Sequence, residues 1–169
     1  MLVSLEEPLV SVGELLVETS AIDALLAAAR ADMDRVAPMH LAAELDAGAL
    51  LVDIRPVGQR ERDGELPGAV VIDRNVLEWR LDPTSAHRIR QVTGPDLRII
   101  IVCNEGYSSS LAAATLRQLG LHAATDVVGG FQALAAPLRR HRRPGRQSSQ
   151  GRRSSHARRN AVEPTFGSG

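Results

Sequence analysis

Two short, mostly apolar runs restrict the fold of this chain more than any other feature. Residues 50–54 read Leu-Leu-Val-Asp-Ile, and residues 97–102 read Leu-Arg-Ile-Ile-Ile-Val. Runs of this kind are typical of strands whose two faces are both covered. We therefore expect a sheet with an apolar layer on each side.

Helical and strand-like segments alternate around these two runs. Further short strands are expected at residues 69–72 and 125–128, and helices at residues 40–47, 109–119 and from 131 onward. Residues 55–68 are interpreted as a polar loop because proline and glycine interrupt them. Strands separated by helices predict a parallel sheet with helices on both faces, which is an α/β fold.

The N-terminal part of the chain has one clear signal. Residues 20–36 alternate apolar with charged residues, and Ser20 with Asp23 can cap them as a helix. The stripe of Ile22, Leu25, Leu26 and Ala29 is expected to lie against the body. Residues 1–19 are either a helix or a loose leader, so residues 1–37 are treated as an N-terminal leader and helix.

The charge is divided unevenly along the chain. All 20 basic residues are arginine; nine fall in residues 139–169, whose only acid is Glu163, whereas residues 1–138 carry 11 arginines against 19 acids. Residues 139–169 lack apolar periodicity and are predicted to be disordered. This basic tail either binds nucleic acid or an acidic partner through counterion release, or is an unselected extension such as a shifted reading frame.

Length and composition narrow the class of protein. The 169 residues fit one domain, residues 38–138, between the leader and the tail. The start of the chain lacks the basic region of a secretory signal, and no apolar run approaches the roughly 18 residues of a membrane span. The expected protein is cytoplasmic and does not bind a membrane.

Cys103 is the only cysteine and follows the second apolar run, where α/β sheets bind ligands. Backbone N–H groups of the next residues can converge on one spot, and Gly106 permits the positive φ that this requires. Such groups, with a helix N-terminus, favour a thiolate or persulfide at Cys103. From its position alone, Cys103 could equally be a buried cysteine whose only role is packing. The candidate loop comprises Asn104, Glu105, Gly106, Tyr107 and Ser108.

Four motifs in order resemble those of rhodanese-like domains. They cover residues 38–137 and match a Val-Asp-x-Arg strand, a Gly-His-Ile-Pro-Gly-Ala turn, a strand-Cys-x-x-Gly-x-Ser/Thr loop and a closing Gly-Gly-Phe-x-x-Trp. Here they read Leu51-Val-Asp-Ile-Arg-Pro56, Gly64-Glu-Leu-Pro-Gly-Ala69, residues 99–109 and Gly129-Gly-Phe-Gln-Ala-Leu134. The segment from Arg74 to Pro83 also resembles a form common in bacterial single-domain members.

The resemblance implies a sulfurtransferase. Cys103 would take sulfane sulfur from a small-molecule donor or a protein persulfide, hold it as a persulfide in the N–H cradle, and pass it to a thiol or cyanide. No metal or organic cofactor is implied. The alternative within the family is a catalytically idle module for protein interaction or sensing.

Three departures from the family pattern affect the interpretation. Glu65 replaces a histidine in a turn, and Leu134 replaces the closing tryptophan. Glu105 places a carboxylate in the loop, where it should repel a dianionic donor such as thiosulfate. A related phosphatase or arsenate reductase is excluded, because those loops need an arginine six residues after the cysteine and this chain has Ser109 there.

Two residues outside the loop, Asp53 and Arg55, are further candidates for lining the site. Asp53 and Arg55 either line it or form a structural ion pair, which is the interpretation we favour. Arg55 is nevertheless the nearest candidate for steering an anion, since the cysteine loop contains no basic residue. Tyr107 either walls the pocket or covers the loop.

Overall fold

All four strands in residues 19–141, the part of the chain that a computed structural model describes, run parallel in one sheet of order β2-β1-β3-β4. They are β1 (Leu50–Asp53), β2 (Val70–Val71), β3 (Ile99–Val102) and β4 (Thr125–Asp126). The two central strands pair along their whole length, from Leu50 opposite Ile99 to Asp53 opposite Val102. The prediction of a parallel sheet is confirmed.

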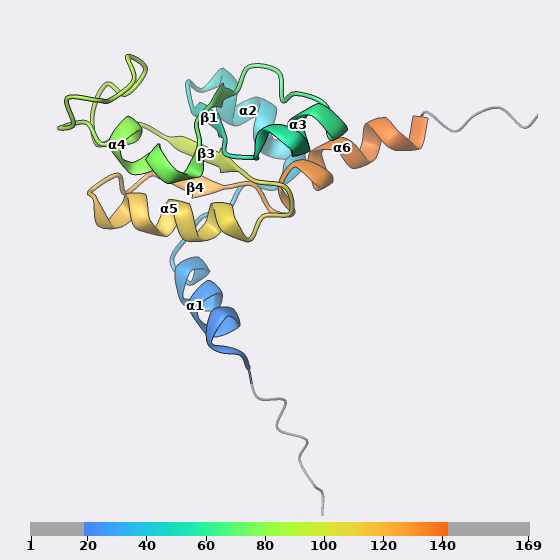
Figure 1. The fold of residues 1–169 in the computed structure, drawn as a ribbon, viewed down its shortest axis with the longest axis horizontal. Coiled ribbons are helices and arrows are strands. Elements are labelled where there is room, and N and C mark those ends of the chain that lie inside the picture. Colours follow the sequence, from blue (N-terminus) through green and yellow to red (C-terminus); the bar gives the residue numbers. More distant parts are fainter. Residues whose placement is uncertain (1–18, 142–169) are drawn as a thin grey trace, which may run out of the picture.

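Helices cover both faces of this sheet (Figure 1). On one face lie α2 (Leu41–Asp46), which follows the 3-10 turn η1 (Pro38–His40), and α6 (Gly130–His141). On the other lie α5 (Ser108–Gln118) and α4 (Leu77–Leu81), which follows the 3-10 turn η2 (Arg74–Val76). Within residues 19–141, none of the helices combines the length and apolar character that crossing a bilayer requires.

The core is divided by β3, whose four residues are fully buried. Successive side chains of a strand point to opposite faces. Ile99 and Ile101 accordingly pack with Leu116 of α5, while Ile100 and Val102 pack with Phe131 of α6. Leu134 lies partly buried in this second cluster. The apolar run of β3 therefore packs against the helices on both faces of the sheet. For this reason its apolar residues do not alternate with polar ones.

One helix lies where the sequence predicted a loop. Helix α3 (Val57–Asp63) occupies the middle of residues 55–68 and follows Pro56. None of its residues is buried, so it has no apolar stripe for a sequence pattern to detect. The interpretation of this segment as a loop throughout is wrong.

The N-terminal helix differs in part from the prediction. Ser20 caps α1 (Ala21–Arg30) by accepting a hydrogen bond from the Asp23 N–H at 3.2 Å, as expected, but the helix ends at Arg30 and not at Val36. Of the predicted stripe only Leu26 is buried, whereas Ile22 and Leu25 are 57% and 56% exposed. The helix therefore contacts the body along a narrow line.

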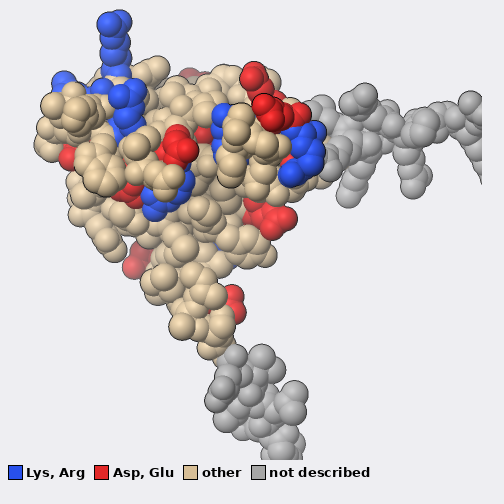
Figure 2. Space-filling view, in the orientation of Figure 1, with Lys and Arg blue, Asp and Glu red and all other residues tan. Residues whose placement is uncertain are grey.

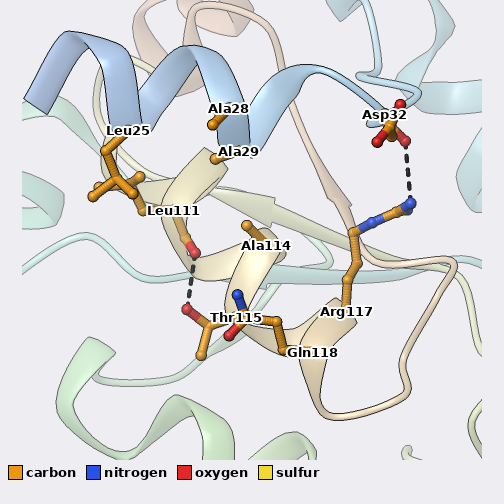
Figure 3. Close-up of a pocket in the computed structure, with 9 residues that line it drawn as sticks. All are labelled: Leu25, Ala28, Ala29, Asp32, Leu111, Ala114, Thr115, Arg117 and Gln118. Carbon is orange, nitrogen blue, oxygen red and sulfur yellow. Dashed lines mark hydrogen bonds between the residues drawn. The ribbon is translucent and has the colours of Figure 1, made fainter.

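Helix α1 packs across α5 and leaves a hollow of about 410 Å³ between them (Figure 3). Leu25 and Ala29 face Leu111 and Ala114 across this hollow. At one end, Arg117 donates to the backbone carbonyl of Asp32 at 3.1 Å, which ties the segment after α1 to α5. None of residues 103–108 lines the hollow, so it is separate from the cysteine loop.

The segment after α1 is also fixed by charge. Arg98 donates to Glu44 at 3.0 Å and lies 3.3 Å from Asp34. The hydrogen bond to Glu44 is the main reason that the pKa of Arg98 is raised above its ordinary value.

Acidic and basic side chains are intermixed over the face of the body seen in Figure 2.

Helix α6 continues to His141, past the predicted start of the tail at residue 139. Residues 1–18 and 142–169, which hold the predicted leader and the rest of the basic tail, lie outside the described residues. Nucleic-acid binding by that tail stays a prediction.

Replacing Leu116 with alanine tests the α5 side of the core. Leu116 is fully buried against β3, so Leu116→Ala should lower the free energy of unfolding by about 2–5 kcal/mol. The matched control is Leu119→Ala, since Leu119 is 46% exposed, and we expect it to cost under about 1 kcal/mol. Urea denaturation measures both, and equal losses would contradict this packing.

Candidate functional site

Cys103 directly follows β3 at the carboxyl end of the sheet and is 8% exposed. Its sulfur accepts hydrogen bonds from the N–H groups of Gly106, at 3.2 Å, and Ser109, at 3.3 Å. The Ser109 hydroxyl lies 3.2 Å from the same sulfur. Several donors therefore converge on one atom. Gly106 belongs to the predicted loop, and Ser109 lies in the helix predicted to follow it.

Glycine at position 106 is a steric requirement of this loop. Its φ is +81°, and a Cβ there would lie 2.9 Å from the backbone nitrogen of Gly129. A side chain would therefore both strain the backbone and push apart the loop and the start of α6. The residue whose N–H faces the sulfur therefore lies at a close backbone approach that only glycine allows.

The first turn of α6 holds the other side of the loop. The Phe131 N–H donates to the Cys103 carbonyl at 2.9 Å, and the Gln132 N–H donates to the Asn104 carbonyl at 3.0 Å. The Gln132 side chain also donates to the Asn104 side-chain oxygen at 2.9 Å. These N–H groups lie at the N-terminus of a helix, where they have no partner within the helix. Asn104 therefore attaches the loop to the first turn of α6 through both its backbone and its side chain.

A buried carboxylate lies behind the cysteine loop. Asp126, the last residue of β4, is fully buried and accepts hydrogen bonds from the hydroxyls of Ser109, at 2.9 Å, and Ser110, at 2.8 Å. Ser109 thus contacts both the carboxylate and the sulfur. The sequence gives no sign that Asp126 belongs to the site, because it is distant from Cys103 in sequence and only the pairing of β3 with β4 brings it to the loop.

The sulfur lies at a hollow of about 320 Å³. Loop residues Asn104, Glu105, Tyr107 and Ser108 line it together with Ile54, Pro56, Gln59 and Arg74. This volume is near the lower end for small-molecule sites, so it suits a small molecule or a single projecting side chain. Glu105 and Tyr107 are exposed at this hollow, so Tyr107 walls it as well as covering the loop.

The cation at this hollow is Arg74, which the sequence did not identify as a site residue. It begins η2 after β2 and donates to Glu78 at 2.7 Å. Arg55, the predicted candidate for steering an anion, is 1% exposed and does not line the hollow. Its guanidinium pairs with Asp53 at 2.8 Å, donates to the Gly64 carbonyl and lies 3.5 Å from the Phe131 ring centroid. Asp53 and Arg55 therefore form a buried ion pair that holds the loop after β1.

No resident metal site is visible in the described part of the chain, where no group of three or more His, Cys, Asp or Glu side chains could hold an ion. At the hollow, the Cys103 sulfur lies among hydrogen-bond donors.

The fold and the loop together define a class: a parallel α/β domain that presents one cysteine in a cradle of N–H groups at the end of its central strand. The family model for the rhodanese-like domain matches residues 38–137. This chain belongs to the rhodanese-like domain family. A comparison with curated proteins found no match.

Solved structures with this fold come from several organisms. A Rhodopseudomonas palustris protein of unknown function, described as a possible tyrosine phosphatase, is 30% identical with a TM-score of 0.62, over 70% of this chain and 92% of that one. The reduced CoADR-RHD protein of Bacillus anthracis gives 24% and 0.52, over 64% of this chain and 17% of that one. A human single-domain sulfurtransferase gives 23% and 0.51, over 60% and 95%.

Gly130→Ala tests the contact between α6 and the cysteine loop. A Cβ at Gly130 would lie 2.5 Å from the Cys103 carbonyl oxygen and 2.7 Å from the Gly106 nitrogen. Gly120→Ala is the matched control, because Gly120 also has a positive φ but has nothing within 4 Å. We expect Gly120→Ala to lose about 1–2 kcal/mol of stability and Gly130→Ala more.

Only Gly130→Ala should also change the rate at which iodoacetamide alkylates Cys103. Thermal unfolding and alkylation kinetics measure the two effects. Equal stability losses with unchanged alkylation in both variants would contradict this contact.

Proposed function

We propose that this protein is a sulfurtransferase that carries sulfane sulfur as a persulfide on Cys103. The observation that carries the proposal is the surroundings of the sulfur: two backbone N–H groups and a hydroxyl around an atom at an open hollow. Donors fixed in this way stabilise negative charge at the sulfur. A cysteine that only filled space would have no need of them.

The proposed reaction has two displacement steps. The Cys103 thiolate attacks the outer sulfur of a donor persulfide, forming a new S–S bond while the donor's S–S bond breaks and its thiolate leaves. An acceptor thiolate then attacks the outer sulfur of the Cys103 persulfide, and Cys103 leaves as a thiolate. With cyanide as acceptor the product is thiocyanate. Both steps are nucleophilic displacements on sulfur, so no external oxidant or reductant is needed.

The site does not support a phosphatase activity, although the Rhodopseudomonas relative is described as a possible tyrosine phosphatase. Phosphate binding in such a loop depends on a guanidinium that grips the oxyanion with two hydrogen bonds. Here the corresponding residue is Ser109, whose hydroxyl contacts the Cys103 sulfur and Asp126. The site therefore lacks the group that phosphate transfer requires. The remaining alternative is an idle module used for protein interaction or sensing.

Loading with a sulfur donor tests the proposal. After incubation with a low-molecular-weight persulfide and removal of the excess, intact-mass spectrometry should show the wild type heavier by one sulfur atom. Cys103→Ser should gain none, and it should transfer none to a thiol or to cyanide. A wild type that gains no sulfur, with both proteins folded by circular dichroism, would favour the idle module.

The charges at the hollow suggest which donor is used. Glu105 and Arg74 line it together, so one carboxylate and one guanidinium face an incoming molecule, and Glu78 already engages Arg74. A dianion gains little net electrostatic attraction from such a pair of opposite charges. We propose that the donor is a low-molecular-weight persulfide or a persulfide on a protein, and not thiosulfate.

Reversing one charge tests this preference. Glu105→Arg should raise kcat/KM with thiosulfate by roughly three- to tenfold, because it removes a repulsion and adds an attraction near the sulfur. Arg74→Gln should lower it. Glu65→Arg is the matched control, since Glu65 is exposed and does not line the hollow.

The effect of Glu105→Arg should shrink as the salt concentration rises, because exposed charges are screened. Equal changes in Glu105→Arg and Glu65→Arg would show that overall charge, and not the site, sets the donor preference.

A further inference from the structure

We propose that Arg30 and Arg35 are positioning residues for the Cys103 loop, supplied by a segment that precedes the rhodanese-like domain. The family model begins at residue 38, so both arginines lie outside it. Each guanidinium nevertheless reaches the carbonyl of Gly106, the residue whose N–H faces the Cys103 sulfur.

The Gly106 carbonyl is surrounded by several hydrogen-bond donors. Arg30 donates to it at 2.7 Å and Arg35 at 3.3 Å, and the Ser110 hydroxyl lies 2.9 Å from it. A peptide carbonyl is the negative end of a dipole, so a carbonyl turned toward the sulfur would oppose negative charge there. Two cations hold this carbonyl and the peptide that follows Gly106, which restrains the backbone of the residue whose N–H, in the preceding peptide, points at the sulfur.

Arg35 has a second role through the buried carboxylate. It donates to both oxygens of Asp126, at 2.7 and 3.1 Å, a two-point contact that compensates the charge of a fully buried side chain. Asp126 in turn accepts from the Ser109 hydroxyl, which has one proton to share between Asp126 and the sulfur. With its charge compensated by Arg35, Asp126 competes less strongly for that proton, and the hydroxyl can turn toward an anionic sulfur.

Arg30, the last residue of α1, makes two further contacts with the loop region. Its Nε donates to the Ser110 hydroxyl at 3.0 Å, and its guanidinium carbon lies 5.7 Å from the Tyr107 ring centroid. Gly106, Tyr107 and Ser110 therefore all contact one side chain from outside the family domain.

The backbone fixes where these arginines lie. Val36 pairs with Val127 beside β4, and its N–H donates to the Asp126 carbonyl at 2.9 Å. The Thr125 hydroxyl donates to the Asp34 carbonyl at 2.7 Å. Residues on both sides of Arg35 are thus tied to the strand that carries Asp126, which keeps the Arg35 side chain close to its partners.

Alkylation of Cys103 by iodoacetamide tests the proposal, because this uncharged reagent requires no sulfur transfer. Arg30→Gln is the first variant, since it leaves no buried carboxylate unpaired. Arg35→Lys is the second; it keeps the positive charge but loses the two-point contact with Asp126. Arg117→Gln is the matched control, because Arg117 holds the same segment through the Asp32 carbonyl and has no contact with the loop.

We expect Arg30→Gln and Arg35→Lys to slow alkylation by roughly three- to tenfold, the scale of one ordinary hydrogen bond lost, with Arg117→Gln near wild type. Melting temperatures identify the variants that remain folded. Wild-type rates in a folded Arg30→Gln protein would overturn the proposal. So would an equal slowing in Arg117→Gln, because that would indicate a general loosening of the segment.

The consequence for turnover rests on the proposed sulfurtransferase function. There the same two variants should lower kcat with little change in KM for the donor, since neither arginine lines the hollow. If the wild type accepts no sulfur, the proposed function fails, but the alkylation series still decides the role of Arg30 and Arg35.

Discussion

The burial of β3 on both faces is the constraint on which the rest of this structure depends. Its four residues alternate between two apolar clusters, so both helical layers need this strand. A parallel strand in the centre of a sheet must end at the edge where the connecting loops gather. Cys103 is the next residue, and its place at the floor of a hollow follows from the packing of the strand before it.

The cysteine loop depends on groups from two separate parts of the chain. On one side, N–H groups at the start of α6 hold the carbonyls of Cys103 and Asn104. On the other, Arg30 and Arg35 hold the carbonyl of Gly106. With its carbonyls engaged in this way, the loop directs the N–H groups of Gly106 and Ser109 at the sulfur. The geometry of a few loop atoms is thus set by segments that lie far away in sequence.

The sequence predicted well where local chemistry is decisive and poorly where distance in sequence separates the partners. The strands at residues 50–54 and 97–102 and the Ser20 cap need only neighbouring residues, and they were found. Helix α3 was missed because it buries nothing and so has no periodicity. Arg74 was missed because only the pairing of β2 with β1 brings η2 beside the end of β3.

The α/β class, the family motifs and the position of the cysteine at a strand end follow from the sequence alone. Each depends only on contiguous residues and on local periodicity. The partner and the location of each charged side chain, in contrast, depend on the tertiary structure. It buried Arg55 with Asp53, placed Arg74 beside Glu105 at the hollow, and joined Arg30 and Arg35 to the back of the loop. An arginine extends over several bonds in any direction, so its partner depends on which segments the sheet and helices bring together.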